Sequence, residues 1–337
     1  MAARAWATGH RARWPAAPAA VRGRSTAPEA AVLGLTAVLR LANLAAVPTD
    51  PYYDAAVRAM GTSWRAFVEG AFEPAGRVAI DKPAPSLWPQ VVATRLLGFD
   101  HRALLLPGAL AGIALVAAAM WLARSLAGRR AGLAAGLALA VLPSAVVTAR
   151  SDTMDALMAA LVTAAAALVV RAARTGRRRP LVAAGVLLGL AFDVKLAEAL
   201  PGVAAAGVLW VLAAARGRGA GLVTGGTATA ATALAWLVAV TLAPLHPRPW
   251  YLGSRDGSPW QAAVVYNGVD RLSGTSAPVR RGARHAREHA IAVARRPGPP
   301  GPLRLLATGT RRRGARRPAG PRRGSGRGRP SARSAGS

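Results

Sequence analysis

The sequence lacks cysteine and contains very little lysine. None of its 337 residues is a cysteine, so disulfide bonds and thiolate metal sites are excluded. Of 44 basic residues, only Lys82 and Lys195 are lysines, and the others are arginines.

Acidic residues number only 14, which leaves a formal net charge of +30. A charge of this size is typical of nucleic-acid-binding proteins. Much of it lies at the two ends of this chain, however, so each region has to be interpreted separately.

Long apolar runs of Ala, Leu, Val and Gly fill the middle of the chain, separated by short arginine clusters. Runs of about 18 or more apolar residues are long enough to cross the hydrocarbon core of a bilayer. The sequence therefore predicts an all-α, multi-pass protein of the cell membrane rather than two soluble domains. About seven spans are expected, at residues 30–47, 103–123, 131–148, 154–170, 181–194, 199–215 and 220–243.

The arginine clusters predict how these spans are oriented. They precede the first span and lie between the second and third, the fourth and fifth, and the sixth and seventh. Basic residues in short loops favour the cytoplasmic side, so we expect a cytoplasmic N-terminus. Glu29 is then the only acidic residue on that side. Either the outer face carries a carboxylate-rich site, or the outer loops hold more acids simply because they are longer.

Residues 48–102 form the first outer loop, which is long and rich in aromatic residues. Aromatic side chains favour the membrane interface, so we expect short amphipathic helices along the outer leaflet. The pair Asp50-Pro51 predicts the start of one of them, because Asp is a good N-cap and Pro suits the first helical position. Whether Asp50 only caps this helix or also has a chemical role stays open at this stage.

The turn Asp81-Lys82-Pro83 follows in the same loop. It can be an ordinary exposed ion pair, which would stabilise the fold little. A composition that uses arginine almost everywhere nevertheless keeps Lys82, and a compact ammonium can bind phosphate as a point charge. Both interpretations remain open.

Two further charged groups are expected at the outer ends of spans. Asp152 and Asp155 are three residues apart and share one face if helical; Asp152 can also act as an N-cap, whereas Asp155 is expected to lie deeper. Asp193 can pair with Lys195, or Lys195 can extend its ammonium to the interface. A phosphate group and an Mg²⁺ or Mn²⁺ ion held by Asp81 and Asp155 would explain both lysines together.

The order of these residues forms a pattern along about residues 30–272. It runs Asp50…Tyr53…Arg58-x-Met60, Asp81-Lys82-Pro83…Trp88, Asp155-Ala156 and Lys195, followed by PRPWYLGSRDGSPWQAAVVYNGVDRL at residues 247–272. The pattern resembles glycosyltransferase family 39, which includes protein O-mannosyltransferases and bacterial lipid A aminoarabinose transferases, and the last segment is similar to actinobacterial members. Family members often carry Asp-Glu where this chain has Thr49-Asp50, so one of two acids is replaced.

The resemblance implies a GT-C fold with amphipathic helices in the first outer loop. It also implies transfer of a sugar from a polyprenyl-phosphate carrier to a lipid, glycan or protein acceptor on the outer face, with inversion at the anomeric carbon. Asp50, Asp81 and Lys82 are the implied catalytic residues. The implied substrate-binding residues are Tyr53, Arg58, Trp88, Lys195, Tyr266 and Asn267.

Three regions are therefore expected: a basic cytoplasmic lead at 1–28, a membrane domain at 29–272, and a tail rich in Arg, Gly and Pro at 273–337. The tail suggests a truncated or frame-shifted end and predicts disorder. It lacks aromatic residues for base stacking, so nucleic acid is not an expected partner. An inactive remnant of the family is the main alternative. A transporter is disfavoured because the acids gather at one surface rather than in mid-span.

Overall fold

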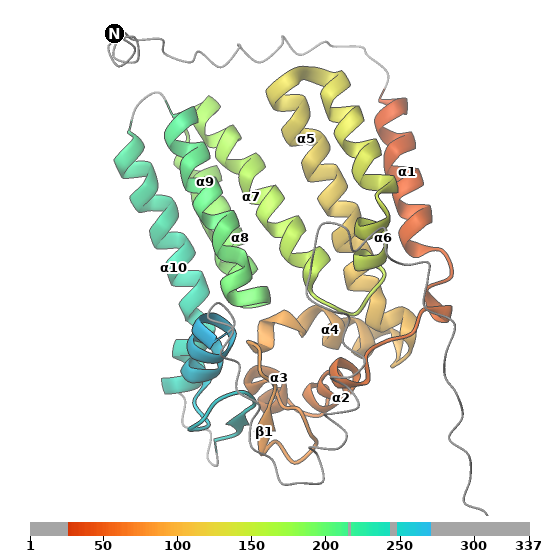
Figure 1. Cartoon of the computed structure of the whole chain (residues 1–337), viewed down its shortest axis with the longest axis vertical. Helices are drawn as coiled ribbons and strands as arrows, with labels where there is room; N and C mark the ends of the chain where they lie inside the picture. Colours follow the sequence, from red (N-terminus) through yellow and green to blue (C-terminus); the bar gives the residue numbers. More distant parts are fainter. Residues whose placement is uncertain (1–25, 215–216, 243–247, 271–337) are drawn as a thin grey trace, which may run out of the picture. The chain divides into compact units, whose positions relative to one another are not determined.

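A computed structural model describes residues 26–214, 217–242 and 248–270 (Figure 1). Within these residues, a bundle of long helices carries a group of short helices at one end. The predicted tail, and the predicted lead apart from its last three residues, lie outside the described part of the chain.

Long helices build the bundle, and several of them are apolar enough to cross a membrane. Five stretches meet this condition by length and composition, which confirms the predicted all-α, multi-pass class. Two of the five, with 41 and 36 residues, are far longer than one crossing requires. The number of seven spans stays a prediction. The helices are α1 Ala27–Leu41, α5 His101–Val141, α6 Pro143–Ala149, α7 Asp155–Thr175, α8 Arg178–Lys195, α9 Leu200–Ala213 and α10 Arg218–Leu242.

The 41-residue helix α5 turns back on itself. Its backbone leaves the helical conformation at Ala127 and at Gly128, where φ is +86°, a value that favours glycine. Beyond the turn, Gly136 lies against Met120 and leaves no room for a Cβ atom. The two legs of α5 are therefore antiparallel, as the second and third predicted spans require.

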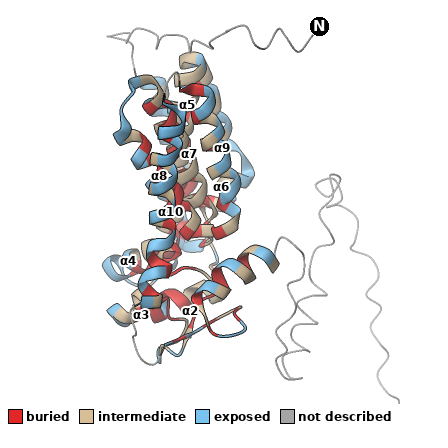
Figure 2. Ribbon diagram, turned by 90° about the vertical axis from the view of Figure 1, so that its left-hand side faces the viewer, coloured by how far each residue is buried: buried red, intermediate tan, exposed pale blue. Residues whose placement is uncertain are grey.

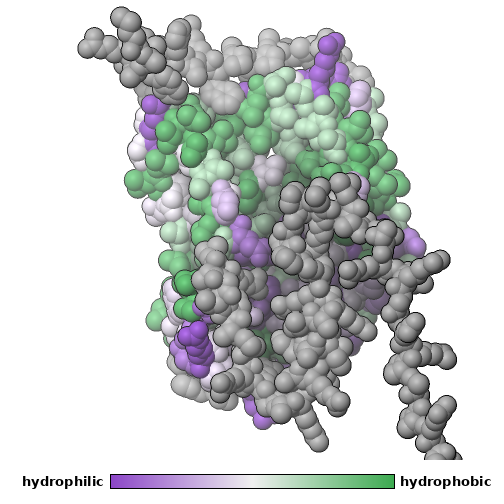
Figure 3. Space-filling view, viewed as in Figure 1, coloured by the Kyte–Doolittle hydropathy of each residue, from purple (hydrophilic) through white to green (hydrophobic). Residues whose placement is uncertain are grey.

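Small residues allow α8 to approach α10 closely. A Cβ atom at Gly185 would collide with the Gly225 carbonyl, and one at Gly189 would collide with Thr232. Figure 2 shows buried residues mainly on the inner sides of the helices. The visible outer surface of the bundle is largely hydrophobic in Figure 3, as expected of a surface that faces lipid.

Residues 48–102, the predicted first outer loop, fold into short helices, which confirms that such helices form there. They are α2 Pro51–Met60, α3 Trp64–Glu69 and α4 Trp88–Leu97, with β1 Val78–Ala79 and the 3₁₀ turn η3 Ala84–Ser86 between them. The Asp50 carboxylate accepts the Tyr52 N–H at 2.9 Å and so caps α2. Helix α2 is amphipathic, because Val57 and Met60 are buried while Arg58 is exposed.

Residues 248–270 return to the first outer loop after α10. Here β2 Trp250–Tyr251 pairs with β1 in parallel, and a π-helical segment, η5 Gln261–Val269, follows. The all-α prediction omitted this two-stranded ladder. Its strands have only two residues each and are 172 positions apart, so no local pattern indicates the pairing.

Candidate functional site

Charged side chains separate to the two ends of the bundle. Glu29 at the start of α1 binds Arg129 at 2.8 Å and Arg124 at 3.3 Å, beside the turn of α5. Lys82, between β1 and η3, and Lys195, the last residue of α8, both bind carboxylates. Figure 1 shows β1 and the short helices at the opposite end of the bundle. The predicted separation of arginine loops from outer acids is therefore present, while the side on which each end lies stays a prediction.

The Asp81-Lys82 turn is largely shielded from solvent. The Lys82 ammonium lies 3.2 Å from Asp81 Oδ1, and the two side chains are only 11% and 12% exposed. The Tyr52 hydroxyl donates to the same carboxylate oxygen at 2.8 Å. Burial is the main cause that raises the pKa of Tyr52, so this hydroxyl keeps its proton and remains a donor. The pair is thus not the ordinary exposed ion pair that the sequence left open.

Lys195 has different partners from the one expected. Its ammonium binds Asp155 at 2.9 Å and Glu198 at 3.1 Å. Asp193 is buried and one of its carboxylate oxygens has no hydrogen-bond partner in the described part of the chain, so the expected Asp193–Lys195 pair is wrong. The reason is helical geometry: positions two apart point to nearly opposite sides of α8. Lys195 instead links the end of α8 to the start of α7.

Asp50, Asp54 and Asp152 form a second set of carboxylates, in the segments that follow α1 and α6. Asp152 Oδ2 accepts the backbone N–H of Asp50 at 2.6 Å, and the Gln90 amide donates to the Asp152 carbonyl at 2.8 Å. Asp152 does not cap α7, which begins at Asp155. Asp152 is buried, only 4% exposed, whereas the Asp155 side chain is 38% exposed, and the depth of Asp155 in the membrane stays a prediction.

Tyr53 lies between these charged groups. Its ring centroid is 5.4 Å from the Lys82 ammonium, within the range of a cation–π interaction. Burial raises the pKa of Tyr53 to about 12, with the negative charge of Asp81 adding to the effect and Lys195 opposing it. A neutral phenol at physiological pH can donate a hydrogen bond to an anionic substrate oxygen.

The other residues predicted to bind substrate have contacts within the protein. The Arg58 guanidinium stacks over the Phe99 ring at 3.8 Å, on the exposed side of α2. The Trp88 indole donates to the Phe67 carbonyl at 2.9 Å. The Tyr266 ring packs against Gly253, and the buried Asn267 amide donates to the backbone carbonyl of Asp81. Their assignment to substrate stays a prediction.

Asp81 and Asp155, the expected ligands of a divalent cation, each hold a lysine in this arrangement. Among residues 26–214, 217–242 and 248–270, no three His, Asp or Glu side chains lie close enough together to hold a metal ion. A divalent cation held by Asp81 and Asp155 stays a prediction.

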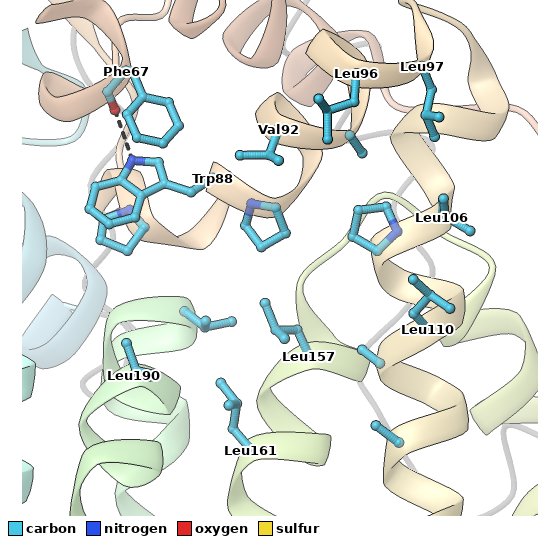
Figure 4. A pocket seen from close by; sticks show the side chains of 17 residues that line it. Phe67, Trp88, Val92, Leu96, Leu97, Leu106, Leu110, Leu157, Leu161 and Leu190 are labelled. Carbon is cyan, nitrogen blue, oxygen red and sulfur yellow. Dashed lines mark hydrogen bonds between the residues drawn. The ribbon is translucent and has the colours of Figure 1, made fainter. Parts of the chain in front are cut away.

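An apolar cavity of about 880 Å³ lies at the end of the bundle that carries the short helices (Figure 4). Side chains from α3, α4, α5, α7 and α8 line it, including Leu110, Leu157, Leu161 and Leu190. Pro85, three residues after Lys82, and Val194, next to Lys195, form part of its wall. The cavity wall thus includes residues that are close in sequence to both lysines.

Sequence reasoning missed this cavity, and it did not foresee that Asp152 is buried. The leucines that line the cavity have the same pattern as leucines that face lipid or neighbouring helices, so no local signal distinguishes them. The cluster Trp88-Pro89 at the start of α4 is the nearest hint, because both residues line the cavity.

The helical bundle, the capped helices of the outer loop and the sheltered charged groups together define a GT-C-like, multi-pass membrane protein. Comparison with known proteins agrees with this class. Residues 81–243 match the family model described as dolichyl-phosphate-mannose-protein mannosyltransferase, so this part of the chain is similar to that family of glycosyltransferases. The resemblance drawn from the short motifs is confirmed.

Two relatives come from Bacillus subtilis (strain 168) and are named "Putative mannosyltransferase YkcB" and "Putative mannosyltransferase YycA". Each is 30% identical over 237 residues, which is 69% of this chain but 33% and 34% of the relatives. The chain thus spans about a third of the length of these curated relatives. No solved structure matches it.

Proposed function

We propose that this chain transfers a sugar from a polyprenyl-phosphate carrier to an acceptor hydroxyl on the outer face of the cell membrane. The observation that carries the proposal is the position of the apolar cavity, which lies against the segments that hold Lys82 and Lys195. A polyprenyl phosphate combines a long apolar chain with an anionic head, and this pairing of surfaces suits both parts. The sugar and the acceptor class, whether lipid, glycan or protein, stay open.

Both lysines can contact a phosphate without losing their present partners. An ammonium has three N–H donors. The described contacts of Lys82 are with the two oxygens of Asp81, and those of Lys195 are with Asp155 and Glu198. One donor of each can therefore turn toward a phosphate oxygen. The two ammonium groups would offset the charge that develops as the carrier phosphate leaves.

Asp50 is proposed as the base that accepts the proton of the acceptor hydroxyl. Its side chain is exposed while its backbone is fixed by Asp152, so it can reach a bound acceptor from a defined position. The acceptor oxygen forms a bond to the anomeric carbon as the bond to the carrier phosphate breaks. A single displacement of this kind inverts the anomeric centre. Tyr53, with its neutral hydroxyl, is proposed to donate a hydrogen bond to the donor substrate.

The variant Asp50→Asn tests this assignment without removing the helix cap, because Asn caps helices as well as Asp does. Loss of a general base typically costs about 10²–10⁴-fold in rate, and we expect a decrease of at least 10²-fold. The measurement is sugar transfer in membranes supplied with a radiolabelled polyprenyl-phosphate mannose. Transfer at the unchanged rate in Asp50→Asn would reject Asp50 as the base.

Asp256→Asn is a matched control for this experiment. Asp256 Oδ1 accepts the Ser258 N–H at 2.8 Å, the same local bond that Asp50 makes with Tyr52, but in the second outer segment. We expect transfer to remain within about two-fold of the unmodified chain, since surface substitutions usually have small effects. A similar loss in both variants would show that Asp50 acts through local structure.

One observation favours an inactive relative as a second candidate. Thr49 occupies the place where family members often have an acid, and its hydroxyl donates to Asp54 Oδ2 at 2.6 Å, a contact within the protein. The absence of transfer in the unmodified chain, with the protein correctly inserted in the membrane, would support this candidate. Restoring the acid by Thr49→Asp and recovering transfer would identify position 49 as the cause.

A further inference from the structure

Asn267 makes a bond that links two distant parts of the chain. Its side-chain amide donates to the backbone carbonyl of Asp81 at 2.5 Å and to that of Ala262 at 2.8 Å. Asn267 is only 6% exposed, and it lies within the π-helical segment η5. Segments of π-helix are rare and frequently lie at functional sites. The two bonds use both N–H groups of the amide, so they fix the orientation of its side chain.

The surrounding backbone docks at the same place. Trp250 donates its N–H to the Arg77 carbonyl at 2.8 Å, and Leu252 donates to the Ala79 carbonyl at 3.0 Å. These bonds place residues 250–252 alongside residues 77–79, and Asn267 then contacts Asp81 two positions further on. Residues 248–270 therefore support the Asp81-Lys82 turn from the backbone side, while Tyr52 holds the Asp81 carboxylate.

We infer that Asn267 is a positioning residue for Lys82. Its bond to the Asp81 carbonyl fixes the peptide that joins Asp81 to Lys82 and thereby directs the Lys82 ammonium toward Tyr53. Buried carbonyl groups require a donor, so loss of the Asn267 amide leaves the turn free to adopt other orientations. This role places residues 248–270, which lie beyond the matched family region, in the support of the site.

The two lysines make this inference directly measurable. Acetylation by an amine-reactive ester, followed by mass spectrometry, reports Lys82 and Lys195 in separate peptides of the same molecule. In Asn267→Ala we expect acetylation of Lys82 to rise about five-fold, the population change that corresponds to one typical hydrogen bond of about 1 kcal/mol. Lys195 has no contact with Asn267 among its described partners, so its acetylation should stay unchanged.

Two further variants separate the hydrogen bond from packing. Asn267→Leu keeps the approximate size of the side chain but has no hydrogen-bond donor, so it should raise Lys82 acetylation as Asn267→Ala does. Val264→Ala shortens an exposed side chain on the same segment and should leave both lysines as they were. An unchanged Lys82 in Asn267→Leu, or an equal rise at both lysines, would overturn the positioning role.

The effect of Asn267 on transfer rests on the proposed function, whereas the acetylation experiment does not. If Lys82 offsets the leaving phosphate, Asn267→Ala should lower kcat about ten-fold with little change in KM for the donor, because a misdirected ammonium loses an interaction made in the transition state. Suppose that Asn267→Ala raises the acetylation of Lys82 alone, but the unmodified chain transfers no sugar. That result would support the positioning role and reject only the proposed function.

Discussion

The two ends of the helical bundle hold their charges in different ways. At the arginine end, Arg124 and Arg129 bind Glu29 with side chains that are 56% and 26% exposed. At the lysine end, Lys82 is 11% exposed and Lys195 is 16% exposed, and both are held by carboxylates. Exposed ion pairs contribute little to stability because water and salt screen them. The lysine end instead holds its charges largely out of water, where ion pairs are screened much less.

Burying charge is costly, and buried ion pairs often stabilise a fold less than apolar residues of the same size would. The buried pairs near the apolar cavity therefore agree with the chemical role that is proposed for the two lysines. The arginine end has a simpler role, since Arg129 and Arg124 connect the turn of α5 to the start of α1. The following predictions test whether the two ends differ in energy as well as in exposure.

The largest difference is expected when one cation is removed from each end. Lys82→Ala leaves the Asp81 carboxylate sheltered without its ammonium, and breaking a buried pair costs about 3–5 kcal/mol. We expect a loss of about 3 kcal/mol in the free energy of unfolding, because Tyr52 still donates to Asp81. Arg129→Ala should cost much less, because water and salt screen an exposed ion pair. Unfolding in detergent micelles measures both, and equal losses would remove the energetic distinction between the two ends.

A smaller effect is expected from filling the apolar cavity. Leu161→Trp places a larger side chain into the space proposed for the polyprenyl chain, and misfitting an apolar pocket costs about 1–3 kcal/mol of binding. We therefore expect KM for a long-chain donor to rise about ten-fold, with a weaker effect on a donor shortened to one or two isoprene units. Leu161→Trp with an unchanged KM for both donors would exclude this cavity as the carrier site.

Leu212→Trp is the control for cavity filling. Leu212 lies on α9, is 67% exposed and does not line the cavity, so the same replacement there faces lipid. Tryptophan on a lipid-facing surface is tolerated, and the KM for the long-chain donor should stay within about two-fold. A rise in KM from Leu212→Trp as large as that from Leu161→Trp would indicate a general effect of the bulky residue on the bundle.

Local chemistry accounts for the parts of this structure that the sequence could predict. Asp50-Pro51 begins a helix because its cap and its proline act within three residues, and the α5 reversal follows from apolar length around an arginine-rich turn. The bond between Asp152 and Asp50 joins residues 102 positions apart, and the bond between Asn267 and Asp81 joins residues 186 positions apart. Hydropathy and capping patterns carry no information on such contacts. The cavity is likewise formed by side chains from five helices, so it cannot be predicted until the packing of those helices is known.

The smallest expected effect concerns Asp152, the buried carboxylate that holds the backbone of Asp50. Burial raises the pKa of Asp152, and the negative charges of Asp54 and Asp50 add to this, although the N–H of Asp50 partly opposes it. Between the ordinary and the raised pKa, the unfolded chain releases a proton that the folded chain keeps. Stability from this group therefore falls as the pH rises through that interval, and the full cost is present at neutral pH.

Asp152→Asn should remove this cost, because an amide oxygen can still accept the Asp50 N–H without a buried charge. We expect the variant to be more stable than the unmodified chain at pH 7, with the gain vanishing below about pH 3, where the carboxylate is protonated in both states. Unfolding in detergent at several pH values measures the difference. A gain that is equal at about pH 3 and at pH 7 would mean that the effect arises from packing. Burial of the ionised Asp152 carboxylate would then not lower the free energy of unfolding.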